Sequence, residues 1–350
     1  MATPCSYPKL GIVIVAYGNH DQEITRMLDL VEQEKRPGDH VVLVDNHPDL
    51  RCSKIAEDHP GVDHVLRPGN IGFGAGCNLG AKWLGDEIDV LLFLNPDAFP
   101  RPGSINVLRE ASTRGWGAWM GLVLLPDGRV NCAGNVVHVS GLAWCAGYAE
   151  PAGRYSKAEE IPCLSGADLA VDRRVWEDIG GFAPEYFLYY EDIDLCFRLQ
   201  LKGYKTGILP ESHIEHDYDF QKNERKWFYL ERNRYLFVIR TWPLSVIVVL
   251  APILLAVEVA LWLISLAQGR FLLKVRSSVA FLKVLPFALR SRHELQAGRV
   301  ISPVEFLDML AYRIDTPLID SFARHPFTNA VLGTYYKLAR SALAVFVRPR

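Results

Sequence analysis

Apolar runs alternate with segments of helical spacing along the first third of the chain. Four apolar runs, LGIVIVAY, HVVLVDN, HVLR and VLLFLN, occur between residues 10 and 95. Segments with helical spacing of apolar residues separate them, over residues 22–34, through Ile55, and over residues 78–84. Strands that are apolar on both faces and separated by helices are typical of a parallel sheet covered on both sides. This third therefore predicts an α/β domain.

The residues that end three of these predicted strands are polar or small: Tyr17 with Gly18, Asp45 with Asn46, and Asn95 with Asp97. In open α/β sheets, ligands bind at the carboxyl ends of the strands. We expect these side chains to meet at one edge of the sheet, where a ligand would bind.

Residues 102–220 break this rhythm with shorter strand patterns, and they predict a mixed α+β half that completes the site. Within them, the stretch YFLYYEDIDLCFRLQLKG has apolar residues at helical spacing behind Glu191, Asp192 and Asp194. Acids in a first turn suit the positive end of the helix dipole. They also suit a general base. The pattern alone leaves both interpretations open.

Residues 244–267 form an apolar stretch with one charge, long enough to cross a bilayer. Pro252 and Glu258 lie inside it, and basic amphipathic segments flank it. An unpaired carboxylate at mid-membrane is costly. A true span, an interfacial or re-entrant hairpin and a buried soluble helix remain open. Both membrane interpretations place the catalytic part on the cytoplasmic side.

The near-zero net charge conceals an uneven distribution of charged residues along the chain. The chain has 350 residues, 38 Lys plus Arg and 40 Asp plus Glu, but residues 222–292 carry about twelve basic residues against three Glu. This favours contact with anionic lipid, and no nucleic-acid motif accompanies the basic residues. The seven cysteines show no metal spacing and predict reduced thiols. The first apolar run is too short for a signal peptide, so we expect no export signal.

Two further patterns carry candidate chemistry. The segment RPGNIGFGAGCNLGAKWL follows a strand, but the first strand lacks GxGxxG and a phosphate-loop Lys, which disfavours a nicotinamide-dependent oxidoreductase. Asp97 in LLFLNPDAFPRPG suits either a turn or a divalent cation. His213, Glu215 and His216 end a later strand pattern and are structural residues or ligands.

Taken in order, these segments resemble a known family. GIVIVAYG, VLVDN, GNIGFGAGCNLG, FLNPD and CLSGADLAVDRRVWEDIGGFAPEYFLYYEDIDLCFRLQLKGYKTGILPESHIEH resemble inverting glycosyltransferases of family 2, most closely the bacterial rhamnosyltransferase branch. The resemblance covers about residues 9–235. It implies a GT-A fold, a Rossmann-like mixed sheet within the α/β class. Residues 1–235 would be the catalytic domain and residues 236–350 a membrane-associating helical region.

The resemblance also implies roles for individual residues. Asp192 would be the base and Glu191 its support, and Asp97, with His216 as a second ligand, would bind Mg²⁺ or Mn²⁺ on the diphosphate. Where many GT-A enzymes carry Asp-x-Asp, this chain has Asn95-Pro96-Asp97. The wall between donor sugar and acceptor would be Gly166, Ala167 and Asp168. The nucleotide pocket would be Tyr17, Asp45, Asn46, Asn70, Gly72 and Asn78, with Asp45 hydrogen-bonding the pyrimidine base.

The implied reaction moves a sugar from a dTDP- or UDP-sugar to a polyprenyl-diphosphate-linked glycan, with rhamnose from dTDP-rhamnose as the favoured donor. The implied location is the cytoplasmic face of the bacterial inner membrane. Transfer to polyprenyl phosphate itself and a catalytically silent nucleotide-sugar-binding assembly subunit are the alternatives. The oligomeric state stays open.

Overall fold

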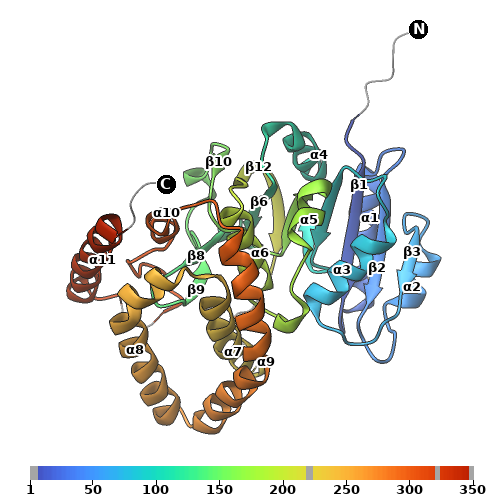
Figure 1. Cartoon of the computed structure of the whole chain (residues 1–350). Coiled ribbons are helices and arrows are strands. Elements are labelled where there is room, and N and C mark those ends of the chain that lie inside the picture. The colour runs from blue at the N-terminus through green and yellow to red at the C-terminus, as the bar shows by residue number, and fades with distance from the viewer. Residues whose placement is uncertain (1–6, 218–223, 320–323, 347–350) are drawn as a thin grey trace. The chain divides into compact units, whose positions relative to one another are not determined.

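The computed structural model describes residues 7–217, 224–319 and 324–346 (Figure 1). Its contacts separate two compact units. The first comprises Met1–Gly134, Ala149–Cys196 and Tyr204–Tyr218, and the second comprises Asn135–Tyr148, Phe197–Gly203 and Asp219–Arg350. The predicted domains, 1–235 and 236–350, assign residues 219–235 differently, and their boundary stays a prediction. Cys5 lies outside the described residues, and the other six cysteines are free thiols.

A mixed sheet forms the centre of the first unit. Its order is β10-β12-β6-β11-β4-β1-β2-β3, with β5 paired to β12 and β7 to β6. The strands are β1 Leu10–Ala16, β2 His40–Asp45, β3 His64–Leu66, β4 Val90–Leu94, β5 Ala98–Pro100, β6 Ala118–Leu124, β7 Val130–Cys132, β10 Glu159–Glu160, β11 Asp168–Asp172 and β12 Thr206–His216. Strands β1 to β4 are parallel, whereas β11 runs antiparallel between β4 and β6. The predicted parallel sheet and the mixed half are one continuous sheet.

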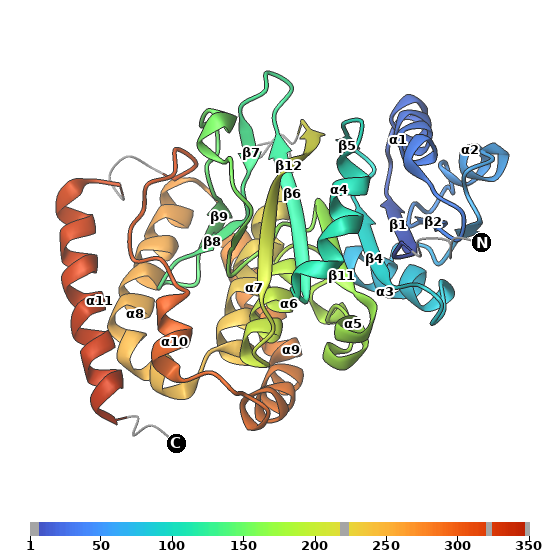
Figure 2. The same cartoon turned by 90° about the horizontal axis from the view of Figure 1, so that it is seen from above.

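Helices cover both faces of this sheet (Figure 2). They are α1 Asp21–Glu34, α2 Ser53–Asp58, α3 Phe73–Trp83, α4 Ser104–Glu110, α5 Arg173–Ile179 and the start of α6 Glu191–Leu201, with short 3₁₀ turns at Ala111–Arg114, Ala152–Arg154 and Pro184–Tyr186. α1 and α4 share a core with Ile12 and Leu92. On the other face, the ring of Trp176 from α5 lies 4.7 Å from that of Phe93.

Helix α3 begins five residues earlier than the spacing predicted, because the glycine run is itself helical. A Cβ at Gly80 would stand 2.4 Å from Val13 of β1. The missing side chain therefore lets α3 lie directly on the strand. A glycine-rich helix has a weak apolar pattern, which is why periodicity alone placed its start too late.

An ion pair is buried where β2 and α4 approach each other. Both Nη atoms of Arg109 donate to Asp39, at 2.7 and 2.6 Å, and neither side chain is exposed. Asp39 also accepts the backbone N–H of Leu10 at 2.8 Å, so the pair fixes the start of β1. Nothing in the sequence pattern predicts this pair.

The second unit is helical. It contains α7 Glu224–Thr241, α8 Leu244–Ala267, α9 Phe271–Ala297, α10 Pro303–Asp308, α11 Pro326–Phe346 and the hairpin β8 Asn135–Val137 with β9 Ala143–Cys145. α8 is long and apolar enough to cross a membrane, and only 11% of its most apolar 18-residue stretch is buried. The interpretation of α8 as a buried soluble helix is therefore wrong.

Glu258, the charge inside α8, lies in a neutral cluster with Glu231, Arg234 and Lys274. Arg234 of α7 donates to Glu258, and Lys274 of α9 lies 3.0 Å from it. Two cations thus offset two carboxylates. The paired arrangement reduces the cost of burying Glu258 that an unpaired charge would carry.

Candidate active site

Two turns of the first unit lie side by side at the carboxyl ends of the central strands. Asp168 of β11 pairs with Leu94 of β4, and the N–H of Asn95 donates to the carbonyl of Ala167 at 3.0 Å. The turn after β4 therefore lies against the segment Ser165–Ala167. This is the edge of the sheet at which the polar strand ends were expected to meet.

The beginning of α6 reaches the same edge. The N–H of Gly166 donates to Oδ2 of Asp192 at 3.0 Å, and Oδ1 of Asp192 accepts the N–H of Ile193 at 2.8 Å. The carboxylate of Asp192 is half-buried. It is thus held by backbone donors beside the predicted wall and stays accessible from solvent.

The other two acids of this helix have different surroundings. Glu191 is only 6% exposed, and its Oε2 has no hydrogen-bond partner among the described residues. Burial, with the charges of Asp192 and Asp194, raises its pKa well above the usual value. Asp194 is fully buried and accepts the hydroxyl of Tyr186 at 3.0 Å. Of these three acids, Asp192 is therefore the one whose side chain is not fully buried.

The aromatic loop before α6, Phe187 to Tyr190, has a strained backbone. Phe187, Tyr189 and Tyr190 have φ of 64°, 66° and 71°, a region that bulky residues rarely adopt. Such strain concentrates at functional sites. The run YFLYY gives no sequence signal for it.

The glycine-rich loop contacts this aromatic loop. Gly72 has φ of 87°, and a Cβ there would stand 2.4 Å from the carbonyl oxygen of Phe187. That carbonyl accepts the N–H of Phe73 at 2.8 Å. Asn46 donates to the carbonyl of Gly72 at 2.9 Å, and Asn70 accepts the N–H of Gly72 at 3.3 Å. The loop thus connects the end of β2 with the approach to α6.

Asp97 and His216 lie together at the ends of two neighbouring strands. His216 pairs with Ala98 across β12 and β5, and its Nε2 lies 3.3 Å from Oδ1 of Asp97. Burial raises the pKa of Asp97, but the hydrogen bond and charge of His216 outweigh it, so the pKa lies below its usual value. Glu215 instead faces Arg26 at 3.2 Å. Of the late-strand candidates, His216 is the one beside Asp97.

Three other predicted residues, Asp45, Asn78 and Asp168, are buried or bonded to the backbone of nearby loops. Asp45 is 0% exposed and accepts the N–H groups of His47, Cys52 and Ser53 and the Ser53 hydroxyl. Its direct hydrogen bond to a base stays a prediction, because these four bonds hold the carboxylate in the loop. Asn78 donates to and accepts from the backbone of Phe182. Asp168 is buried, and burial raises its pKa well above the usual value.

Tyr17 remains open to a ligand. It is 50% exposed, and its ring lies 5.3 Å from that of His47. The pattern of strand ends did not single out His47, although it follows Asp45 and Asn46 directly. We add it to the candidate nucleotide pocket on this contact.

The residues that suit a divalent cation are one carboxylate and one imidazole. Oxygen from Asp97 and nitrogen from His216 fit Mn²⁺, which accepts both ligand types, better than Mg²⁺, which prefers oxygen. Within residues 7–217, 224–319 and 324–346, no group of three or more His, Cys, Asp or Glu side chains could hold a metal. Diphosphate oxygens and water would complete the coordination.

Comparisons with known proteins identify the family. The model of glycosyl transferase family 2 matches residues 11–123, and that of glycosyl transferase family group 2 matches residues 153–289. An N-acetylglucosaminyl-diphospho-decaprenol L-rhamnosyltransferase of Mycobacterium tuberculosis is 30% identical over 235 residues, which cover 59% of this chain and 75% of the relative. Rhamnosyltransferase WbbL of Escherichia coli K12 is 24% identical, covering 59% of this chain and 82% of the relative.

The fold has a solved counterpart. The structure of GalNAc-T7 with UDP, GalNAc and Mn²⁺ superposes with a TM-score of 0.56 at 17% identity, covering 68% of this chain and 48% of that chain. The predicted GT-A fold class is confirmed. The chain belongs to glycosyltransferase family 2, in its rhamnosyltransferase-like branch, and is a glycosyltransferase.

Proposed function

We propose that this glycosyltransferase moves a sugar, with inversion, from a nucleotide-sugar to a hydroxyl of a lipid-linked cell-envelope glycan. The observation that carries the proposal is the placement of Asp192, which accepts the N–H of Gly166 at 3.0 Å. Among the three acids of α6, this half-buried carboxylate combines access with fixed orientation. A general base needs both properties.

The proposed reaction is one in-line displacement. Asp192 in its ionised form takes the proton of the acceptor hydroxyl. The hydroxyl oxygen bonds to the anomeric carbon as the bond from that carbon to the diphosphate oxygen breaks. Attack opposite the leaving group inverts the anomeric carbon. Glu191, whose raised pKa keeps it protonated at higher pH than an ordinary carboxyl, limits the negative charge beside Asp192.

We place the diphosphate of the donor near Asp97 and His216. A divalent cation held there would neutralise negative charge on the leaving diphosphate. The pKa of Asp97 lies below its usual value, so its carboxylate is ionised and available as a ligand, and His216 would bind the cation in its neutral form. Tyr17 and His47 would stack on or border the base, and the loop from Asn70 to Gly72 would lie over the nucleotide.

The donor and acceptor are proposed from the relatives. Two of them are named as rhamnosyltransferases, and one name specifies an N-acetylglucosaminyl-diphospho-decaprenol acceptor. We therefore propose dTDP-rhamnose as the donor and a polyprenyl-diphosphate-linked glycan as the acceptor. The exposed apolar helix α8 supports action at a membrane surface, for which we propose the cytoplasmic face of the inner membrane.

The experiment incubates the full chain with Mn²⁺ or Mg²⁺, a panel of dTDP-, UDP- and GDP-sugars, and lipid-linked acceptors that include polyprenyl phosphate. Release of one nucleoside diphosphate together with a glycolipid of inverted anomeric configuration, by NMR, is expected. Product from polyprenyl phosphate alone would contradict the proposed acceptor. Donor binding without turnover on acceptors proven competent would contradict catalysis and favour an assembly subunit.

The cation ligands are tested separately by binding. We expect Asp97→Asn to weaken Mn²⁺ binding in the presence of nucleoside diphosphate about tenfold or more, because an amide is a poorer ligand for a hard cation than a carboxylate. The free Mn²⁺ signal in electron paramagnetic resonance measures this. Asp127→Asn, at an exposed turn, is the matched control. Equal Mn²⁺ affinity in the two variants would remove Asp97 from the proposed ligand set.

A further inference from the structure

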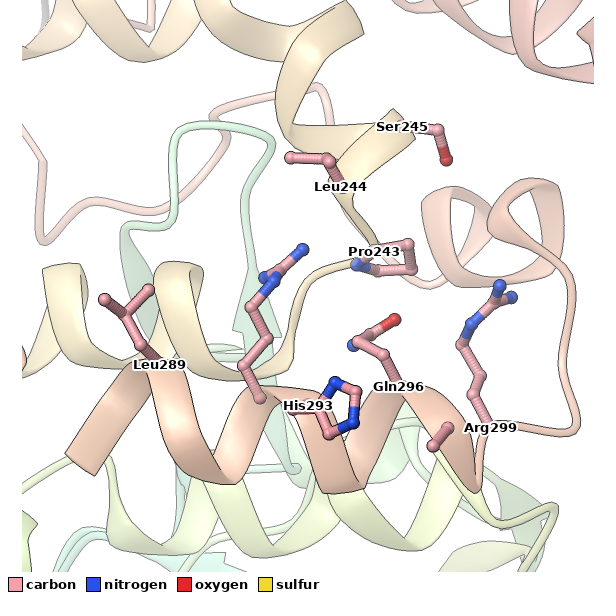
Figure 3. A pocket seen from close by; sticks show the side chains of 9 residues that line it. Pro243, Leu244, Ser245, Leu289, His293, Gln296 and Arg299 are labelled. Carbon is pink, nitrogen blue, oxygen red and sulfur yellow. The ribbon is translucent and has the colours of Figure 1, made fainter. Parts of the chain in front are cut away.

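The second unit carries an open cleft of about 600 Å³ beside the start of α8 and the end of α9. Figure 3 shows His293 and Gln296 on the last turns of α9 and Arg299 just beyond its end, below the first turn of α8, which contributes Leu244 and Ser245. No part of the proposed transfer reaction uses these residues.

The cleft is cationic. Arg292 and Arg299 line it with permanent charges, His293 adds a third when protonated, and no described lining residue is acidic. Arg292 is partly buried, and this burial lowers the pKa of its guanidinium. Arg292 donates Nη1 to the carbonyl of Ile239 at 2.6 Å, which fixes the side chain in place. The cleft thus holds positive charge whose position is fixed by the fold.

One carboxylate whose pKa the charge of Arg299 affects is Glu305, and it caps another helix. Hydrogen bonds from Ser302 lower the pKa of Glu305, with a smaller contribution from the charge of Arg299. Glu305 accepts the N–H of Ser302 at 2.6 Å in the capping box of α10. Its charge is committed to that helix start and leaves the cleft cationic.

The start of α8 adds backbone donors to the same cleft. The first helical bond runs from the N–H of Ile247 to the carbonyl of Pro243 at 3.0 Å. The N–H groups of Leu244, Ser245 and Val246 therefore have no acceptor within this 24-residue helix. No described side chain caps the helix. Such ends favour negatively charged groups, and phosphate in particular.

An apolar surface adjoins the cations. Leu244 and Leu289 line the cleft and are 65% and 52% exposed. The exposed apolar residues continue along α8 through Val248 and Leu255. A soluble phosphate would neutralise the cations and leave these residues in water, at the usual cost of exposed apolar area. The surface matches a phosphate that carries a hydrocarbon chain.

We propose that this cleft binds the phosphate of an anionic membrane lipid, with the lipid chain against the apolar residues of α8. The cleft then fixes which end of α8 lies at the level of the headgroups. This site is separate from the proposed transfer reaction and does not depend on it.

The test measures binding of the full chain to phosphatidylcholine vesicles with and without phosphatidylglycerol, by co-sedimentation. Because each basic residue near an anionic surface contributes about fivefold in affinity, the pair Arg292→Gln with Arg299→Gln should weaken binding to anionic vesicles about 25-fold. The matched control is Arg276→Gln with Arg290→Gln, two exposed arginines of α9 outside the cleft. Equal losses in both pairs would overturn a specific site.

A second variant guards against misfolding, since Arg292 holds a backbone carbonyl. His293→Glu changes an exposed side chain and places a negative charge in the cleft. We expect it to weaken binding to anionic vesicles and to leave binding to phosphatidylcholine unchanged. Inorganic diphosphate is the soluble probe. If it raises the melting temperature of wild type without vesicles, and His293→Glu abolishes that rise, the ligand is a soluble phosphate and the lipid proposal is overturned.

Discussion

Three carboxylates lie within four residues at the start of α6, and they differ in burial and in hydrogen-bond partners. Asp194 accepts a buried tyrosine hydroxyl, Glu191 is enclosed, and Asp192 is held by Gly166 at an accessible edge. The general-base interpretation stays a prediction, and it rests on Asp192. Asp194 supports the fold, and Asp192 is the candidate base.

The contact between the glycine-rich and aromatic loops is testable with two alanine substitutions. Gly72→Ala adds a Cβ 2.4 Å from the carbonyl of Phe187, whereas Gly69→Ala, also at positive φ, meets nothing within 4 Å. Both variants place alanine at positive φ, and Gly72, with ψ of 167°, lies in a region that is essentially restricted to glycine, so its backbone cost, about 1–3 kcal/mol, adds to that of the contact. We expect Gly72→Ala to lose more stability and at least tenfold more turnover than Gly69→Ala. Equal effects would show that the loop contact is unimportant.

Asp168 gives a prediction on pH. Its unfolded carboxyl ionises near 3.8, while burial keeps the folded one protonated well above that value. The folded state then binds more protons, so this residue lowers stability as pH rises from the unfolded pKa toward the folded one. Asp168→Asn removes that loss and keeps an oxygen for the N–H of Gly121. The melting temperature of the variant relative to wild type should rise between pH 5 and 8, measured by calorimetry, and an unchanged difference would contradict this.

Residue roles could be predicted only in part. The resemblance pointed to Asp192, Asp97 and His216, and the structure brings the last two together. The resemblance gave no indication that Asp45 hydrogen-bonds to the backbone of the loop that follows it, or Asn78 to the backbone of Phe182. The second contact was not predictable because it joins segments 104 residues apart. His47 was missed for the same reason.

At the scale of elements, the buried Arg109–Asp39 pair joins the starts of β1 and β2 to α4. Removing one partner leaves an uncompensated buried charge, so Arg109→Met should lower the free energy of unfolding by about 3–5 kcal/mol. Arg129→Met breaks an exposed, solvent-screened ion pair with Asp127 and should cost much less. Urea denaturation of both variants measures the contrast. A cost for Arg109→Met no larger than that of the control would contradict the role of the pair.

The alternation of strands and helices predicted β1 to β4 because buried parallel strands are apolar throughout. The antiparallel insertion of β11 between β4 and β6 was not predictable, since pairing joins residues far apart in sequence. The helical start of α3 was also missed, because its small residues weaken the apolar periodicity that helix prediction uses.

An exposed apolar surface distinguishes the second unit. Leu255, Val259 and Leu263 of α8 are each more than half exposed. If α8 rests in a membrane, replacing all three by Ser should weaken vesicle binding at least about tenfold, because each buried apolar side chain contributes about 1.5–3 kcal/mol. Leu50→Ser, an exposed leucine of the first unit, is the control. Unchanged binding of the triple variant in flotation assays would contradict membrane contact by α8.

The division of the chain into an α/β part and a basic, apolar helical part followed from composition. The neutral cluster about Glu258 did not, because its members come from three helices. That cluster explains how an apolar helix tolerates a carboxylate, which the sequence presented as a conflict.

The most direct test of the account compares Asp192→Asn with wild type. The variant keeps an oxygen for the N–H of Gly166 but cannot take a proton. Turnover with nucleotide-sugar and lipid-linked acceptor should fall about 10²–10⁴-fold, while donor affinity by calorimetry is preserved. Asp86→Asn, a fully exposed site, is the control and should match wild type. Turnover in Asp192→Asn equal to that of the control would contradict the assignment of Asp192 as the base.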